Sequence, residues 1–363
     1  MRRKLLFLSV IVAPVLAGCA QPATPLAAEP TAEPVAGPAE TAEPTNTPAP
    51  TPTPTPTQTP TPQVPPDPAA IAGDYPRVDG STSALPLQTT IACHLLDVTC
   101  AWAGGEDDEE FPPLFWEGRR IVPVFLADPP DEAVERIYSL WHTGTHSAYV
   151  NLIEGNADFI LVARSPSPDE RIASKGHGVE LDVRPVALDA FVFLVNTANP
   201  LDDLTTEAIR DIYTGQITDW AALGGPEESI QAYLRNENSG SQELMKTLVM
   251  QGEPMIDAPD MILESMIGPI NAIGDDPLGI GYSVYFYATY ILPSPQIKLI
   301  GVDGVHPTAE TIASRTYPLA TEVYAVVRAD TPPDSTAVML RDWLFTEEGQ
   351  ATIAESGYVP LEP

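Results

Sequence analysis

Residues 77–95 read RVDGSTSALPLQTTIACHL, and this stretch indicates how the folded part of the chain is built. Residues 77–79 have the character of a short strand, and the glycine and hydroxyl residues at 80–83 that of a turn. From residue 87 onward, leucine or isoleucine recurs at every fourth position, which is typical of an amphipathic helix. The stretch is therefore expected to form a strand, a turn and a helix in succession.

The same alternation continues along the chain and predicts the fold class. Apolar runs that are typical of buried strands alternate with segments whose apolar residues repeat at helical spacing. The expected strands are residues 121–126, 159–163, 186–195, 279–286, 297–302 and 322–327, and the expected helices are 147–154, 204–213, 219–223, 244–249 and 336–345. Pro123 favours an edge position for the first of these strands. Such alternation is typical of α/β proteins with largely parallel sheets.

The N-terminal residues have the composition of an export signal. Residues 2–4 are basic, residues 5–16 are apolar, and two small residues precede Cys19. Residues 1–18 are therefore expected to be a signal peptide. Residues 16–19 (LAGC) resemble the bacterial lipobox, in which the cysteine becomes the mature N-terminus and carries a diacylglycerol. We expect Cys19 to be lipidated and to anchor the protein to the cell membrane, facing outside the cytoplasm; the alternative is a plain secretory signal.

Residues 19–72 are expected to form a disordered tether. Sixteen of the 41 prolines lie between residues 20 and 72, with Thr-Pro repeats from 47 to 62 and no lysine or arginine. Such a composition favours an extended polyproline II chain without a packed core. The residues that follow the tether are enough for two lobes.

The charge of the chain limits its partners. Fifty acidic residues stand against 18 basic ones, so the net charge is −32 at pH 7. A field of this sign repels polyanions, which disfavours nucleic-acid binding and adsorption to anionic lipid. No apolar run of 18 residues follows residue 20, so membrane contact is expected through the lipid anchor only.

With Cys19 lipidated, Cys93 and Cys100 remain as an even pair in an oxidising compartment. Seven residues within one helix would separate their Cα atoms by about 10 Å, which is too far for a disulfide. A bond between them therefore requires the helix to end near Asp97. Two separate packed thiols are the alternative.

Turns rich in hydroxyl groups and glycine begin three of the expected helices, at residues 80–83, 143–147 and 239–241. Helix N-termini offer unpaired N–H groups, and serine and threonine add neutral donors. One such turn alone says little, because these residues are also common N-caps. Three turns facing one cleft would form an anion site. Arg235 adds a guanidinium suited to bidentate contact with an oxyanion, unless it is a surface arginine.

These segments resemble the phosphate-binding protein of bacterial ABC phosphate transporters, from about Tyr75 to Pro360. The matching motifs are GSTSALPL (80–87), IYTGQITDW (212–220), RNENSGSQ (235–242), GIGY (279–282), YPL (317–319) and EGQ (348–350). The resemblance implies an α/β, two-lobed type II periplasmic-binding-protein fold with two crossing hinge strands and a ligand in the cleft. Lobe one would be residues 75–188 and 317–363, lobe two residues 189–316, and the crossing strands 186–195 and 317–326.

The resemblance also implies which residues bind the ligand. They are Ser81, Thr82, Ser83, Thr145, Ser147, Arg164, Ser165, Arg235, Ser239, Gly240 and Ser241. Glu237 stands where family members often have an aspartate that orients the arginine. After the strand at 159–162, many members carry an aspartate that accepts the proton of phosphate, whereas this chain has Ala163. Because that acceptor is what rejects sulfate, phosphate and other oxyanions such as sulfate both stay open.

The function that the resemblance implies is solute binding by a monomer. The protein would bind an inorganic oxyanion, with phosphate as the first candidate, and deliver it to the permease subunits of an ABC transporter. A sensor or adhesion module on the same fold is the alternative. No cofactor and no enzymatic activity are expected, since the sequence lacks G-x-S-x-G, S-x-x-K and P-loop motifs. No metal site is expected, because His142 and His146 lack a third ligand at matching spacing.

Overall fold

The structure is a computed structural model of the 363-residue chain and describes residues 66–104, 119–124 and 132–361. These residues belong to one compact unit, which begins at residue 61. The expected signal peptide, Cys19 and the tether as far as residue 65 lie outside the described residues. Among the helices of the described part, none combines the length and the apolar character needed to cross a bilayer.

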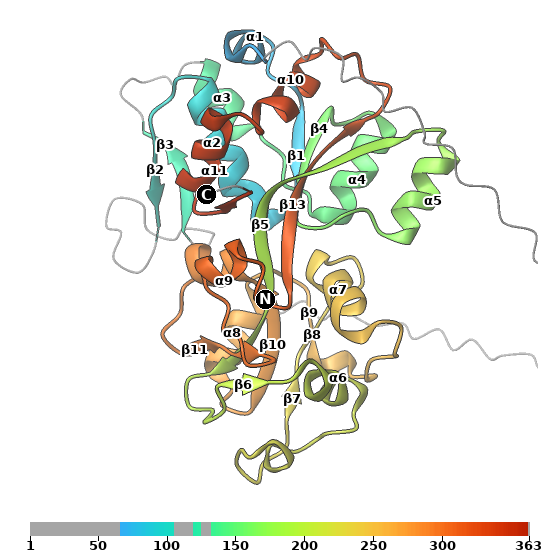
Figure 1. Ribbon diagram of the computed structural model, residues 1–363, viewed down its shortest axis with the longest axis vertical. Coiled ribbons are helices and arrows are strands. Elements are labelled where there is room, and N and C mark those ends of the chain that lie inside the picture. Colours follow the sequence, from blue (N-terminus) through green and yellow to red (C-terminus); the bar gives the residue numbers. More distant parts are fainter. Residues whose placement is uncertain (1–65, 105–118, 125–131, 362–363) are drawn as a thin grey trace, which may run out of the picture. The chain divides into compact units, whose positions relative to one another are not determined.

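Two long strands, β5 (Leu181–Asn196) and β13 (Ala320–Arg328), run between two α/β lobes (Figure 1). The first part of β5, up to Ala190, pairs with β13, and from Phe191 onward it pairs with β10. The sheet order is β1-β4-β13-β5-β10-β7, with β11 and β14 also paired to β5. Residues 186–196 are buried throughout, as their predominantly apolar sequence predicts for a strand covered on both faces.

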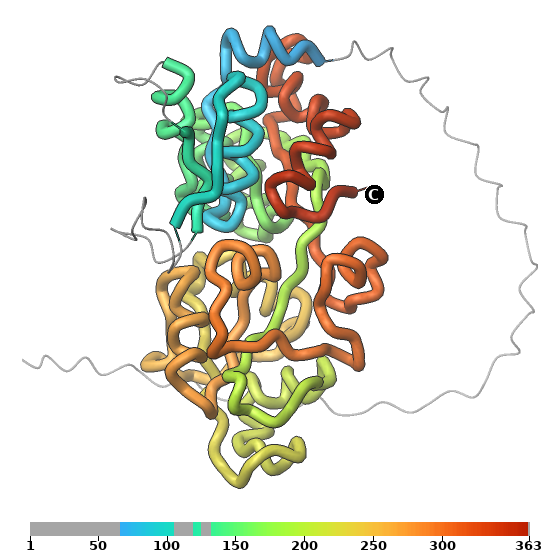
Figure 2. Tube along the Cα trace, turned by 90° about the vertical axis from the view of Figure 1, so that its left-hand side faces the viewer, coloured from blue at the N-terminus to red at the C-terminus, as the bar shows by residue number. Residues whose placement is uncertain are grey.

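Lobe one contains both ends of the described chain (Figure 2). Its helices are α1 (Pro68–Gly73), η1 (Thr82–Ala84), α2 (Leu85–Leu95), α3 (Glu132–Tyr138), α4 (Thr145–Glu154), α5 (Pro168–Gly176), α10 (Thr336–Trp343) and α11 (Glu347–Glu355). Its shorter strands are β1 (Val78–Gly80), β4 (Phe159–Val162) and β14 (Val359–Pro360), with a separate hairpin of β2 (Cys100–Ala103) and β3 (Arg120–Pro123).

Lobe two is built from the middle of the chain. Its strands are β6 (Asp203–Leu204), β7 (Gln231–Ala232), β8 (Leu234–Arg235), β9 (Ile262–Leu263), β10 (Gly279–Val284), β11 (Ile297–Leu299) and β12 (Gly301–Val302). Its helices are α6 (Thr206–Thr214), η2 (Trp220–Leu223), α7 (Gly240–Leu244), η3 (Met245–Met250), η4 (Pro259–Met261), α8 (Gly268–Asp275), η5 (Tyr287–Ile291) and α9 (Ala309–Ala313). Aromatic rings of β5, α6 and β10 pack together in its core.

Most expected elements are present, but the expectation of largely parallel sheets is wrong. The pairs β1–β4, β10–β7, β12–β6 and β8–β9 are parallel, whereas β5 is antiparallel to β13, β10, β11 and β14. The reason is the topology: β5 and β13 carry the chain between the lobes in opposite directions, and each strand that pairs with them is antiparallel to them. The strand expected at 121–126 is described only up to residue 124, and β3 pairs with β2 alone. Helix α11 was not expected.

The expectation of an unfolded tether through residue 72 is wrong at its end. Residues 68–73 form α1, and Ile71 is fully buried in the core of lobe one. Asp67 caps the helix by accepting a hydrogen bond from the backbone N–H of Ala69 at 3.0 Å, and Pro68 occupies the first helical position. The tether therefore ends before residue 67, where a short apolar segment can pack.

Cys93 and Cys100 form a disulfide, with their Cα atoms 6.1 Å apart. Helix α2 ends at Leu95, and Asp97 takes a left-handed backbone conformation with φ of 55°. The helix thus stops before Asp97, as a disulfide at this spacing requires. The bond ties α2 to the start of the β2–β3 hairpin.

Asp189 lies where β5 passes from one lobe to the other, between its pairing with β13 and its pairing with β10. Its Oδ1 accepts hydrogen bonds from the backbone N–H groups of Ala190 (2.8 Å) and Phe286 (3.0 Å). Its Oδ2 is buried without a partner among the described residues. Burial outweighs the two hydrogen bonds and raises the pKa of this carboxyl to about 7.

Candidate functional site

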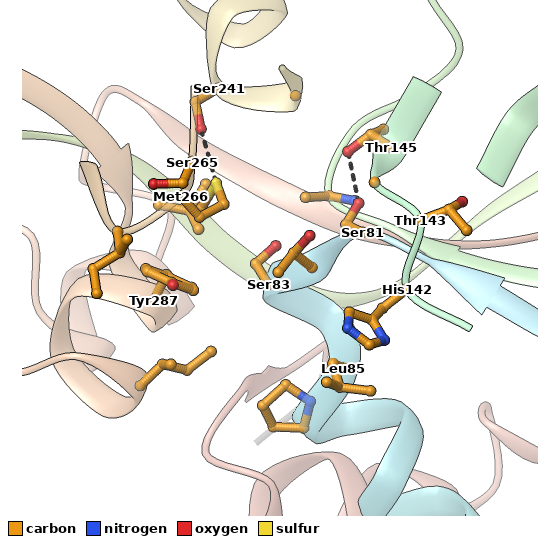
Figure 3. Close-up of a pocket in the computed structure, with 18 of the residues that line it drawn as sticks. Ser81, Ser83, Leu85, His142, Thr143, Thr145, Ser241, Ser265, Met266 and Tyr287 are labelled. Atoms are coloured by element: carbon orange, nitrogen blue, oxygen red, sulfur yellow. Dashed lines mark hydrogen bonds between the residues drawn. The ribbon is translucent and has the colours of Figure 1, made fainter. Parts of the chain in front are cut away.

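A cavity of about 1050 Å³ lies between the lobes and is lined by residues of both. Nine of the eleven predicted ligand residues line it. These are Ser81, Thr82, Ser83, Thr145 and Ser147 from lobe one, and Arg235, Ser239, Gly240 and Ser241 from lobe two. The three hydroxyl-rich turns of the sequence therefore do converge on one cleft, as Figure 3 shows for Ser81, Thr145 and Ser241.

The two turns of lobe one are held together by Asp79, a fully buried residue of β1. Its carboxylate accepts hydrogen bonds from the backbone N–H of Gly80 (2.7 Å), from the N–H (2.9 Å) and hydroxyl (2.7 Å) of Thr143, and from the amide of Asn151 (2.7 Å). Sequence reasoning missed this residue. Its only signal was an acid inside a short apolar strand.

The hydroxyl groups of Ser81 and Thr145 lie 2.7 Å apart, and Ser81 also accepts the N–H of Ala163 at 2.9 Å (Figure 3). One of the two hydroxyl groups donates its proton to the other in this hydrogen bond. The remaining hydroxyl proton is therefore available to a ligand. Helix α4 begins at Thr145 with no side-chain cap on its first turn. Its first N–H groups are therefore available as additional donors at the same place.

The lobe-two turn at residues 239–241 lies close to Thr145 of lobe one. A Cβ atom at Gly240 would stand 2.6 Å from the hydroxyl of Thr145, so only glycine allows this approach between the lobes. Ser239 is buried, and its hydroxyl has no hydrogen-bond partner within the described ranges. The hydroxyl of Ser241 contacts the sulfur of Met266 at 3.6 Å (Figure 3). Both serines thus offer donors that the protein itself does not use fully.

Arg235 is the buried cation of the cleft, with an exposed fraction of 5%. Its Nε donates to the carbonyl of Leu263 at 2.9 Å, and its two Nη atoms lie 3.3 Å from the carbonyl of Glu264 and from the sulfur of Met266. No carboxylate of the described residues forms an ion pair with it. Burial lowers the pKa of this guanidinium, and the carboxylate of Glu264, which forms no ion pair with it, offsets this effect only in part.

Arg164 and Arg341 are also buried, but unlike Arg235 they form ion pairs with carboxylates of the protein. Arg164 donates two hydrogen bonds of 2.8 Å to the buried carboxylate of Glu170, and Arg341 is paired with Asp182 and Asp342. A buried charge without a partner is costly. Arg235 therefore marks a place that requires an anion from outside the protein.

Arg164 and Ser165 do not line the cavity, so the structure does not bring them together with the other predicted ligand residues. Arg164 pairs with Glu170 instead. The carboxylate of Glu170 is held inside lobe one by a hydrogen bond from the backbone N–H of Ser167, at the start of α5. Glu237 does not orient Arg235 either. It is exposed and bonded to Lys246, which lies on the same surface.

Sequence reasoning missed Glu264, the one carboxylate that lines the described part of the cavity. Its Oε2 accepts a hydrogen bond of 2.7 Å from the amide of Asn236. Glu264 follows β9, which pairs with β8 beside Arg235, and no local pattern signals that pairing. His142 and His146 also line the cavity, but no cluster of metal-ligating side chains is found in the residues that the structure places.

Residues 140–348 match the family model described as the PBP superfamily domain. The chain belongs to this superfamily. Two solved structures with the same fold are an ABC-type phosphate transport receptor from Vibrio cholerae (20% identity, TM-score 0.54) and a substrate-binding protein of a phosphate ABC transporter from Clostridium perfringens, solved with phosphate (21%, 0.58). Each comparison covers 78% of this chain and 98% of the other. They place the PBP superfamily chain in the two-lobed fold that its sequence predicted.

Among curated relatives of this PBP superfamily member, the phosphate-binding protein PstS of Bacillus subtilis is 27% identical over 180 residues, which cover 48% of this chain and 56% of that protein. PstS of Borreliella burgdorferi is 24% identical over 182 residues, which cover 48% of this chain and 64% of that protein. The chain therefore spans about three-fifths of the length of these relatives.

Proposed function

We propose that this protein is an extracytoplasmic solute-binding protein that binds an inorganic oxyanion, with phosphate as the first candidate, and delivers it to an ABC permease. The observation that carries the proposal is Arg235, a buried guanidinium on the cleft without a carboxylate partner in the described chain. The names of its relatives, which are phosphate-binding proteins, support phosphate as the ligand.

The proposed binding mode uses donors from both lobes. The nine lining residues among those predicted contribute serine and threonine hydroxyls, the first N–H groups of α4 and the guanidinium of Arg235. Because these donors lie on two lobes joined by β5 and β13, a bound oxyanion would hold the lobes together. We propose the lobe boundaries as residues 75–188 with 317–363 for lobe one, and 189–316 for lobe two, with α1 packed against lobe one.

The remaining parts of the proposal follow from the sequence. Residues 1–18 direct export, Cys19 carries the lipid anchor, and the proline-rich tether separates the body from the membrane. The protein acts as a monomer and has no catalytic activity.

The test is isothermal calorimetry with phosphate. Replacing Arg235 by alanine should weaken phosphate binding by about 2 to 4 kcal/mol, because a desolvated charge-assisted contact is lost. Arg235→Lys should recover only part of this, since lysine lacks the planar fork. Arg315→Ala, at an exposed arginine paired with Glu322, is the matched control and should bind like the wild type. An Arg235→Ala variant with wild-type affinity would contradict the proposal.

A second candidate ligand is another oxyanion such as sulfate, and Ala163 favours it. This residue lines the cavity at the position where a proton acceptor would reject fully ionised anions. Calorimetry of the wild-type protein with phosphate, sulfate and molybdate separates these ligands. A non-transport sensor remains the alternative role, and co-purification with permease subunits separates it from transport.

A further inference from the structure

Beside the hydroxyl-rich turns, the cavity has an extended apolar wall. It comprises Leu85, Ile121 and Leu140 of lobe one and Ile267, Tyr287 and Ile291 of lobe two. Tyr287 and Ile291 are buried and the other four are half-buried. Figure 3 labels Leu85, Ser83 and Tyr287 among the residues that line the pocket. An inorganic oxyanion would contact the polar turns and leave this wall unused.

The cavity is also much larger than an inorganic oxyanion. An inorganic oxyanion has five heavy atoms, and even at about 30 Å³ for each it fills roughly 150 Å³. The cavity of about 1050 Å³ instead has the dimensions of a site for a small organic molecule.

The apolar wall is held in place by covalent and hydrogen-bonded contacts. The disulfide between Cys93 and Cys100 fixes the start of the β2–β3 hairpin to α2. At the other end, the backbone N–H of Arg119, next to β3, donates to the carbonyl of Ile291 at 2.7 Å. This bond joins the lobe-one part of the wall to the lobe-two part. The apolar surface is therefore positioned by the fold.

The hydrogen-bond acceptors that line the cavity are a second, independent observation. A carboxylate is the strongest acceptor for the P–OH proton of monohydrogen phosphate, yet Ala163 presents only a methyl group, and the described lining has Glu264 as its sole carboxylate. Glu264 is already bonded to Asn236. An organic phosphoryl dianion has no such proton, because its fourth substituent is an organic group.

We propose that the cleft binds an organic phosphoryl anion, with its PO₃ group at the polar turns and Arg235 and its apolar substituent on the apolar wall. A phosphate monoester and a phosphonate share this chemistry. This inference rests on the proposed function, because the PO₃ group would occupy the anion site proposed there. It differs in the class of ligand, which is organic and not inorganic.

The test is calorimetry of the full chain with inorganic phosphate, phenyl phosphate, phenylphosphonate and phenyl sulfate. Phenyl phosphate should bind at least tenfold more tightly than inorganic phosphate. Equal binding of phenylphosphonate would point to phosphonates as ligands as well, whereas weak binding would restrict the class to monoesters. Tight binding of phenyl sulfate alone would contradict the phosphoryl assignment.

Variants of the wall separate its contribution from that of the polar turns. Ile121→Ser and Ile267→Ser should each weaken phenyl phosphate at least threefold and change inorganic phosphate by less than twofold. Ile172→Ser, at an exposed isoleucine of α5 outside the cavity, is the control and should change neither. Retained phosphate binding shows that the variants are folded.

The two proposals can fail separately. If inorganic phosphate binds as tightly as phenyl phosphate or more tightly, the organic ligand is excluded and the proposed function stands. If phenyl phosphate binds and inorganic oxyanions do not, the inference stands and the inorganic ligand is wrong. If no anion binds, both are overturned.

Discussion

If the cleft binds an oxyanion as proposed, Ala163 is the position at which phosphate and sulfate can be distinguished. Its N–H is fixed by Ser81, and its side chain lines the cavity. Replacing it by aspartate should raise the preference for phosphate over sulfate at least tenfold, because the carboxylate accepts the proton of HPO₄²⁻ but repels SO₄²⁻. Competitive calorimetry with phosphate and sulfate measures this preference.

The control for this substitution is Ala163→Asn, which adds similar volume without charge and should not favour phosphate. If the aspartate variant loses both anions equally, residue 163 does not face the bound anion.

Asp189 predicts a pH dependence of stability. Its folded pKa of about 7 lies above the ordinary 3.8, so the folded state holds a proton that the unfolded state releases. The contribution of Asp189 to stability is therefore complete below pH 4 and is lost as the pH rises to about 7. The total is on the order of a few kcal/mol. Urea unfolding between pH 4 and 8 should show this decrease in the wild type.

Asp189→Asn should remove that part of the slope, while Asp330→Asn, at an exposed aspartate, should keep it. Identical pH profiles for wild type and Asp189→Asn would show that the buried carboxyl does not titrate in this range.

At the scale of single residues, the sequence predicted the hydrogen-bond donors of the cleft better than it predicted which charged residues pair with one another. Hydroxyl-rich turns and Arg235 could be recognised because local composition determines them. The ion pairs of Arg164 and Glu237 could not, because several acids and bases lie near each in sequence and only the packed fold selects among them. Asp79 was missed for the same reason, since three of its four donors are more than 60 residues away.

At the scale of elements, α1 extends the folded body into the proline-rich region. Ile71→Ser should lower the free energy of unfolding by about 2 to 4 kcal/mol, because Ile71 is fully buried in the core of lobe one. Urea unfolding measures the change, with exposed Ile172 replaced by serine as the reference. Unchanged stability would mean that α1 is dispensable and that the tether does reach residue 72.

Apolar periodicity predicted many of the helices and strands, but it missed helices α3, α5, α8, α9 and α11, and it did not predict strand direction. Val186 to Val195 was recognised as a strand, and β5 contains it. Its antiparallel neighbours depend on which segments cross between the lobes, and a run of apolar residues carries no information about direction. The helix α11 was missed because residues 347–355 show only a weak apolar stripe, with three of their nine residues buried.

At the scale of the whole molecule, a net charge of −32 should matter little for ligand binding. The donors of the cleft act at hydrogen-bond distance, whereas the field of distant charges is screened beyond about 8 Å at physiological salt. Phosphate affinity should therefore change less than about threefold between 0.1 and 0.5 M NaCl. Calorimetry over this range checks it, and a steep loss of affinity would mean that long-range attraction carries the binding.

The two-lobed architecture could be predicted because the family motifs keep their order along the chain. The ligand cleft between the lobes could be predicted with it, but the apolar wall of the cavity could not, since this wall combines residues from 85 to 291 that no single motif contains.

The order of the strands also bears on how the chain folds as it is made. In lobe one, β13 lies between β4 and β5, although it is synthesised more than 120 residues after β5. The sheet of this lobe therefore lacks an interior strand until residue 328 has left the ribosome, while lobe two is complete by about residue 316. Lobe one, whose translation begins first, can therefore be completed only after lobe two. A lobe that is incomplete throughout synthesis would suit the export proposed for this chain, because passage through a narrow channel requires an unfolded chain.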